Sequence, residues 1–104
     1  MVHPTRARSE ELMSDTNLDQ TLLALADPTR RRVIDLLRKK PRRAGDLADA
    51  LDMSPPRLSR HLRILRKSGL IEDSGVDHDA RVSLYRLKPE PFETLRNWLQ
   101  DTLA

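Results

Sequence analysis

The sequence contains no cysteine, so its 104 residues can form neither a disulfide nor a thiolate metal site. The longest apolar run covers only residues 22–26, whereas a membrane-spanning helix needs about 20 apolar residues. No apolar stretch near the N-terminus has the character of a signal peptide. Together these absences favour a soluble protein of the cytosol.

Aromatic residues are also scarce, since Tyr85, Phe92 and Trp98 are the only three. A chain of this length makes one domain and buries roughly two-thirds of the surface of its unfolded form. Its core must therefore be aliphatic and thin. A second subunit would add buried apolar surface, so the composition gives a first reason to expect a homodimer.

Charge is plentiful, and it is segregated along the chain. Residues 28–69 carry thirteen basic and four acidic side chains, a balance of +9, whereas residues 1–27 and 70–104 each have a balance of −3. A basic block between two acidic ones is typical of a surface that binds a polyanion. The alternative is a solvated, arginine-rich helical surface, and the pattern within the block decides between the two.

The polar, aperiodic residues 1–14 are predicted to be a disordered extension, followed by one folded domain over residues 15–104. Hydrophobic spacing, proline positions and Gly69 predict four helices, over residues 15–27, 28–40, 44–51 and 55–67. The third and fourth are joined by a tight break at residues 52–54. Two short helices joined in this way make a helix-turn-helix.

Beyond Gly69 the pattern predicts a short strand over residues 70–72, a polar loop over residues 73–80 and a second strand over residues 81–87. A final helix begins near Pro89. The expected fold is therefore mainly α with a small β-hairpin. It is a winged helix-turn-helix with about five helices and a two-stranded wing.

The helix over residues 55–67 carries the strongest functional signal. At about 100° per residue, three leucines share one face and must point to the core: Leu58, Leu62 and Leu65. The opposite face and its flanks hold five cations, and the helix contains no acidic residue. Like charges at this spacing repel each other by roughly a few tenths of a kcal/mol per pair. The arrangement therefore favours an anion bound along this face.

The major groove of B-DNA admits an α-helix, and arginine can contact guanine there through two hydrogen bonds. Side chains near the start of such a helix reach base edges, and later ones reach phosphates. We predict base-edge or nearby phosphate contacts for Ser54, Arg57, Ser59 and Arg60. We predict phosphate contacts for Arg63 and Lys67.

Other candidates for DNA binding leave two interpretations open. His61 lies about 60° from the leucine face, so it is either a half-buried structural residue or a DNA contact, and we count it among the DNA-binding residues. Arg42 and Arg43 precede the third helix, whose N-terminal amides can bind phosphate, or they are solvated loop cations. Of three consecutive arginines on the second helix, only Arg30 or Arg31 is expected to reach DNA.

A resemblance to the ArsR/SmtB family of bacterial repressors covers about residues 18–103. Its most specific pieces are LADPTRR and SRHLRILRKSGLI, followed by a hairpin that ends in LYRL. The tail PEPFETLRNWL looks like a subgroup that lacks the usual metal ligands. The resemblance implies a homodimer built on the first and last helices, a fourth helix that reads DNA, and a repressor that is released by a signal.

The sequence departs from the family's pattern in three places. Where many relatives carry a thiolate pair at the start of the third helix, this chain has Arg-Ala-Gly-Asp at residues 43–46. The metal site that relatives build on the last helix is also missing, because that helix has Asp101 but no histidine. Pro55 and Pro56 remove two backbone N–H donors from the start of the fourth helix, so base contacts there need not follow the family's preference.

The predicted wing tip is unusual because it is acidic. Arg81 is its only cation and the only wing residue that we expect to touch DNA, since phosphate would repel the rest of the tip. Asp77, His78 and Asp79 could instead bind a divalent cation through oxygen and imidazole ligands, although acidic loops are more often simply solvated. We predict no metal or other cofactor, and a metal-responsive repressor with a non-thiolate site stays as an alternative.

The first and last helices carry more apolar side chains than the surface of a small monomer should expose. We predict that they form the dimer interface, with the residues Leu18, Leu22, Leu25, Phe92, Leu95, Trp98, Leu99 and Leu103.

The leading hypothesis is a dimeric repressor that binds a palindromic site on double-stranded DNA. An alternative from another class is a winged-helix module that docks onto a protein, which needs an exposed apolar patch more than a cationic helix face. An enzyme is not expected, because there is no glycine-rich phosphate loop and the three histidines, His3, His61 and His78, lie in unrelated places.

Overall fold

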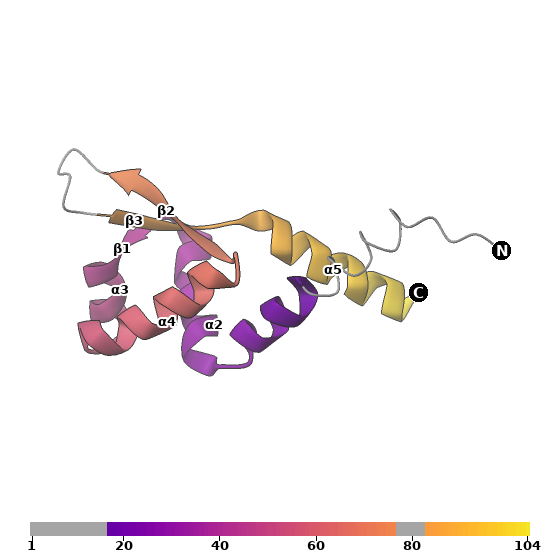
Figure 1. The fold of residues 1–104 in the computed structure, drawn as a ribbon, viewed down its shortest axis with the longest axis horizontal. Helices are drawn as coiled ribbons and strands as arrows, with labels where there is room; N and C mark the ends of the chain where they lie inside the picture. Colours follow the sequence, from indigo (N-terminus) through magenta and orange to yellow (C-terminus); the bar gives the residue numbers. More distant parts are fainter. Residues whose placement is uncertain (1–16, 77–82) are drawn as a thin grey trace.

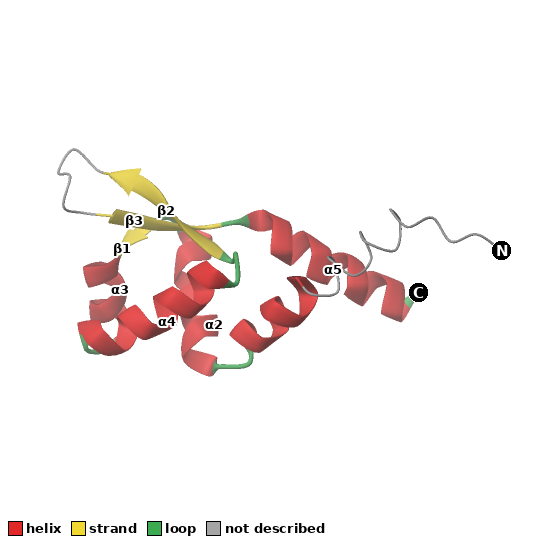
Figure 2. Ribbon diagram, viewed as in Figure 1, coloured by secondary structure: helices red, strands yellow, loops and turns green. Residues whose placement is uncertain are grey.

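The computed structural model describes residues 17–76 and 83–104 of the chain. Helices pack against one side of a small sheet, and the last helix leaves the sheet at one end (Figures 1 and 2). In chain order the helices are residues 17–25, called here the N-terminal helix, then α2 (Pro28–Lys39), α3 (Ala44–Leu51), α4 (Pro55–Lys67) and α5 (Pro89–Leu103). The predicted winged helix-turn-helix is confirmed. No helix in these two ranges combines the length and the apolar content that a membrane crossing requires.

The sheet has three antiparallel strands in the order β1–β3–β2, one strand more than predicted. The wing consists of β2 (Ile71–Val76), which extends four residues beyond its predicted end, and β3 (Ser83–Leu87). The additional strand β1 (Arg42–Arg43) pairs with the middle of β3 and places Arg42 opposite Tyr85. The sequence does not predict β1, because two adjacent cations have no apolar alternation.

The core is aliphatic, as the scarcity of aromatic residues predicts. Its buried apolar side chains come from all helices except α5 and from the start of the wing: Ala24, Val33, Ile34, Leu37, Leu47, Ala48, Leu51, Leu58, Leu62, Leu65, Leu70 and Ile71. Tyr85 and Phe92 pack against the edge of this cluster. The predicted leucine face of α4 is therefore confirmed, and its burial determines which side of α4 faces outward.

The turn between α3 and α4 is formed by residues 52–54. Asp52 ends α3 in the left-handed region with φ 50°, which aspartate tolerates better than most residues. Ser54 then occupies the N-cap of α4, but its hydroxyl makes no cap hydrogen bond. The two prolines that follow have no N–H to donate, so only one of the two usual partners remains.

The N-terminal helix and α5 together form the end of the molecule away from the wing (Figure 1). None of the residues of α5 is buried, and the N-terminal helix buries only Thr21 and Ala24. The Thr21 hydroxyl donates a hydrogen bond of 2.9 Å to the Asn17 carbonyl, so this buried polar group is satisfied. Leu25 of the N-terminal helix and Phe92 of α5 are partly buried against the core, so both elements are attached to it by few side chains.

Candidate nucleic-acid interface

The outer face of α4 is a row of exposed cations, called here the α4 cation face: Arg57, Arg60, Arg63, Arg66 and Lys67. Within residues 17–76 and 83–104, none of these five side chains forms an ion pair or a hydrogen bond. The predicted segregation of leucines from cations on this helix is therefore present in the structure. A helix surface of this kind is complementary to a polyanion.

The last turn of α4 contains an open hollow of about 460 Å³ that is lined by Arg63, Arg66 and Lys67. A hollow with a wholly cationic lining suits a phosphate group, because charge-assisted hydrogen bonds to phosphate are the stronger kind. Arg66 was not among the predicted contacts. Its place beside Lys67 in the basic last turn is the sequence signal that could have found it.

The predicted hydroxyl contacts lie on the same helix. Ser54 and Ser59 are both exposed. Because Ser54 does not use its hydroxyl for capping, that group is available at the start of α4. The positions of both residues are compatible with base-edge contacts, which stay a prediction.

Arg42 and Arg43 do not lie on an open loop, since they form β1. The Arg42 side chain is half-buried and its Nε donates a hydrogen bond of 3.2 Å to the Leu36 carbonyl at the end of α2. Arg43 is exposed and occupies the N-cap of α3, with no side-chain cap hydrogen bond. The structure therefore gives Arg42 a structural partner, and Arg43 is the more exposed of the two; DNA contacts by either stay a prediction.

Arg30 and Arg31, one of which is expected to contact DNA, both make hydrogen bonds within the chain, and that DNA contact stays a prediction. Arg30 Nε donates to the Ala24 carbonyl at 2.6 Å, and Arg31 Nη1 donates to the Leu25 carbonyl at 2.6 Å. The Arg30 side chain is only 14% exposed. These groups hold the end of the N-terminal helix and do not extend the α4 cation face.

His61 lies on the inner edge of α4 and is half-buried. Its Nδ1 is enclosed and has no hydrogen-bond partner in the described part of the chain. The imidazole lies near the Asp27 carboxyl and lowers the pKa of that carboxyl. These surroundings favour the structural interpretation of His61, and a DNA contact by its outer edge stays a prediction.

The Asp27 carboxylate stabilises the start of α2. It accepts hydrogen bonds from the backbone N–H of Thr29 at 2.8 Å and of Arg30 at 3.1 Å. Desolvation raises the pKa of this carboxyl, but those two N–H groups, the Arg30 guanidinium and His61 outweigh it and leave the pKa below its usual 3.8. The ionised form is therefore the one that the folded protein prefers.

Replacing Asp27 by alanine is expected to destabilise the protein at neutral pH by about 0.5–2 kcal/mol, through loss of the cap. The variant Asp27→Asn keeps a capping oxygen and serves as the control. Because folding lowers the carboxyl's pKa, its stabilising charge is present above about pH 4 and is lost as the pH falls further. Urea unfolding at fixed protein concentration should thus separate wild type from Asp27→Asn at pH 7, and the difference should disappear as the pH falls through the lowered pKa of Asp27. Equal pH profiles throughout would contradict this assignment.

The wing is held by a cross-strand ion pair in which Arg86 Nε donates to Glu72 Oε1 at 2.7 Å. The wing-tip candidates Arg81, Asp77, His78 and Asp79 lie outside the described residues. Within the two described ranges, no group of three or more histidine or acidic side chains is arranged to hold a metal ion.

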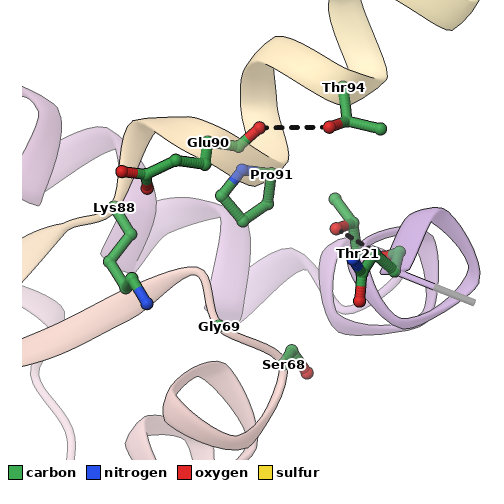
Figure 3. Close-up of a pocket in the computed structure, with 8 residues that line it drawn as sticks. Thr21, Ser68, Gly69, Lys88, Glu90, Pro91 and Thr94 are labelled. Atoms are coloured by element: carbon green, nitrogen blue, oxygen red, sulfur yellow. Dashed lines mark hydrogen bonds between the residues drawn. The ribbon is translucent and has the colours of Figure 1, made fainter. Parts of the chain in front are cut away.

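A polar pocket of about 300 Å³ lies where the N-terminal helix, the end of α4 and the start of α5 meet. Figure 3 shows Thr21 on one side and Thr94 on the other, with Pro91 and Lys88 along the wall. The Thr94 hydroxyl donates to the Glu90 carbonyl at 3.3 Å, as the Thr21 hydroxyl does within its own helix. The hydroxyl protons of Thr21 and Thr94 are therefore already donated to carbonyls of their own helices. The lining of this pocket includes none of the residues of the α4 cation face.

The predicted dimer residues divide into two groups. Leu25 and Phe92 pack against the subunit's own core, and Leu18 and Leu95 are half-buried. Large apolar side chains left exposed at this end are Leu22 at 43%, Leu23 at 71%, Trp98 at 48%, Leu99 at 46% and Leu103 at 86%. Leu23 was not predicted, because it falls outside the i, i+4, i+7 spacing of its helix.

Comparison with known proteins gives the family. Residues 27–73 match the family described as bacterial regulatory protein, arsR family. The transcriptional repressor SdpR of Bacillus subtilis (strain 168) is 32% identical to this chain over 82 residues, which make up 79% of this chain and 88% of that protein. The chain belongs to the arsR family. This confirms the resemblance found in the sequence.

A further relative and a solved structure agree with this assignment. The HTH-type transcriptional regulator Rv2034 of Mycobacterium tuberculosis (strain ATCC 25618 / H37Rv) is 35% identical over 78 residues, covering 75% of this chain and 70% of that protein. The crystal structure of an ArsR family transcriptional regulator has a TM-score of 0.75 at 32% identity and covers 86% of this chain and 89% of its own. The protein is a DNA-binding transcriptional regulator with the winged-helix fold of the arsR family.

Proposed function

We propose that the protein is a homodimeric repressor that acts in the bacterial cytosol and inserts α4 of each subunit into the major groove of a palindromic operator. In this proposal Arg57, Arg60, Ser59 and the N-cap residue Ser54 contact base edges or nearby phosphates. Arg63, Lys67 and Arg43 contact the DNA backbone, and Arg81 does so from the wing.

The observation that supports DNA binding most strongly is the α4 cation face itself. The helix carries five exposed cations that have no acidic partner in the described residues, and their mutual repulsion destabilises it. Phosphates would remove that repulsion and release the counterions of the duplex. Arginine also offers the paired donors that guanine accepts in the major groove.

The apolar end of the molecule supports the homodimer. Phe92, Leu99 and Leu103 lie within about 40° of one another around α5, so the face that touches the core continues beyond it. An open groove of about 710 Å³ between α2, β3 and α5 adjoins this face, and it is lined by the apolar Ile34, Leu87, Pro89 and Phe92 and by the charged Arg38, Glu93 and Arg96. A second copy that covered it would bury the apolar surface that each monomer exposes.

Selection of bound duplexes from a random DNA pool at low ionic strength tests the proposal. We expect a two-fold symmetric motif whose half-sites are centred about 10 base pairs apart, because dimers place two recognition helices one turn of B-DNA apart. Affinity for the selected duplex should fall steeply with salt. Enrichment of no duplex, or of a motif without symmetry, would contradict the proposal.

A further inference from the structure

Among the described residues, a single backbone bond beyond the helix caps the end of the N-terminal helix, since the Ala26 N–H donates to the Leu23 carbonyl at 3.3 Å. The last four carbonyls of an α-helix have no partner inside the helix. A glycine in the left-handed conformation commonly closes such an end, but here the helix is followed by Ala26, Asp27 and Pro28. Proline cannot continue the helix, so another group has to supply donors.

Two arginines from the next helix supply them. Arg30 Nε donates to the Ala24 carbonyl at 2.6 Å and Nη2 donates to the Leu23 carbonyl at 3.3 Å. Arg31 Nη1 donates to the Leu25 carbonyl at 2.6 Å. Three of the four terminal carbonyls are therefore bound by guanidinium groups, which also oppose the negative end of the helix dipole.

Besides these hydrogen bonds, the helix contacts the core through Leu25, which is only partly buried. Its buried side chains are Thr21 and Ala24, which offer small apolar surfaces. Beside it lies the polar pocket of about 300 Å³, so one flank against α5 is not closely packed (Figure 3). In the described residues, the two guanidinium groups provide side-chain hydrogen bonds that join the N-terminal helix to α2.

The same turn presents the apolar surface proposed for dimerisation. Leu22 and Leu23 are 43% and 71% exposed, and the carbonyl of Leu23 is itself one of the bound groups. Any rotation of this turn would move these side chains against a partner subunit and change the separation of the two α4 helices. Because one base pair of offset rotates a half-site by about a tenth of a turn, such a change alters which operators fit.

We infer that Arg30 and Arg31 are positioning residues that fix the N-terminal helix on α2 and thereby set the half-site spacing that the dimer accepts. They act through the Leu23, Ala24 and Leu25 carbonyls and do not touch DNA. The inference rests on the proposed dimeric repressor and adds to it the determinant of operator geometry.

The test compares the double variant Arg30→Ala/Arg31→Ala with Arg32→Ala, a control that removes a neighbouring exposed arginine for which the described residues show no bond. The probes are the duplex selected from the random pool, versions with the half-sites moved by one or two base pairs, and an isolated half-site. Wild type and Arg32→Ala should prefer one spacing by at least about tenfold, and the double variant by less than about threefold. Half-site affinity and the salt dependence should match those of Arg32→Ala.

Spacing preference that survives in the double variant, together with a shallower salt dependence than the control, would show phosphate contacts and overturn the inference. If the double variant does not fold, Arg31→Ala is used, because this side chain is exposed. Hydrogen exchange should then be at least about tenfold faster in residues 17–25 and unchanged in α4. Unchanged exchange in residues 17–25 would overturn the inference. Wild-type protein that binds no duplex overturns the proposed function itself, which is a different result.

Discussion

Replacing Leu99 by aspartate is expected to give monomers that bind the selected operator at least about 100-fold more weakly than wild type. Leu99 is 46% exposed in the single chain and lies on the face of α5 that continues from the core. In the proposed dimer that face would be covered, so the new carboxylate would be buried without a partner. Such a burial is among the most costly changes that a protein interface can undergo.

Asn97→Asp is the matched control, since it adds the same charge to an exposed position about 160° around α5. It should leave both the dimer and the operator affinity within about twofold of wild type, because surface substitutions of this kind have small effects. Sedimentation at micromolar concentration measures the oligomeric state and titration of labelled duplex measures affinity. A Leu99→Asp protein that sediments as a dimer would refute the placement of the interface on α5.

The bounds of the DNA-binding helices could be predicted because prolines and a glycine mark them. Pro28 and Pro55 occupy the first turns of α2 and α4, and Gly69 adopts φ 76° just after α4. Strand β1 could not be predicted, since its pairing depends on the far end of the chain around Tyr85 and not on its own two residues. Local signals suffice where the backbone itself is constrained, and they fail where tertiary contacts decide.

The N-terminal helix shows a second limit of the sequence pattern. Leucine spacing predicts an interface stripe that includes Leu22, which the single chain leaves exposed, but it does not predict that Thr21 and Ala24 are buried or that Leu23 is exposed. Small side chains allow close approach to α2 and carry little hydrophobic signal. The N-terminal helix thus faces the core with Thr21 and Ala24, and the exposed Leu22 and Leu23 are available to a second subunit.

The arginines show why the site could be predicted only in part. A guanidinium group binds carbonyl oxygens and phosphate oxygens with the same donors, so composition does not distinguish Arg30 from Arg60. The difference lies in what surrounds them: Arg30 follows a helix whose last carbonyls accept its donors, whereas the described residues show no acceptor bound by the cations of α4. Counting acceptors near each arginine therefore gives information that charge alone does not.

Replacing Arg60 by alanine is expected to lower affinity for the selected operator by about 1–3 kcal/mol, because a base-reading arginine loses two hydrogen bonds to guanine. Arg60 is exposed on the middle of α4 and has no partner in the described part of the protein. Its removal therefore breaks nothing in the fold. Thermal unfolding should be unchanged or slightly raised, since one source of like-charge repulsion on α4 is gone.

Lys67→Ala is the matched control, because it removes one cation from the same helix at the position expected to contact only phosphate. That variant should weaken operator and random duplex alike and reduce the salt slope by about 0.9. Arg60→Ala should weaken the operator far more than the random duplex and relax the preference for one base pair. Equal losses on both duplexes would make Arg60 a backbone contact, and base reading would then have to come from Arg57 and the serines at the start of α4.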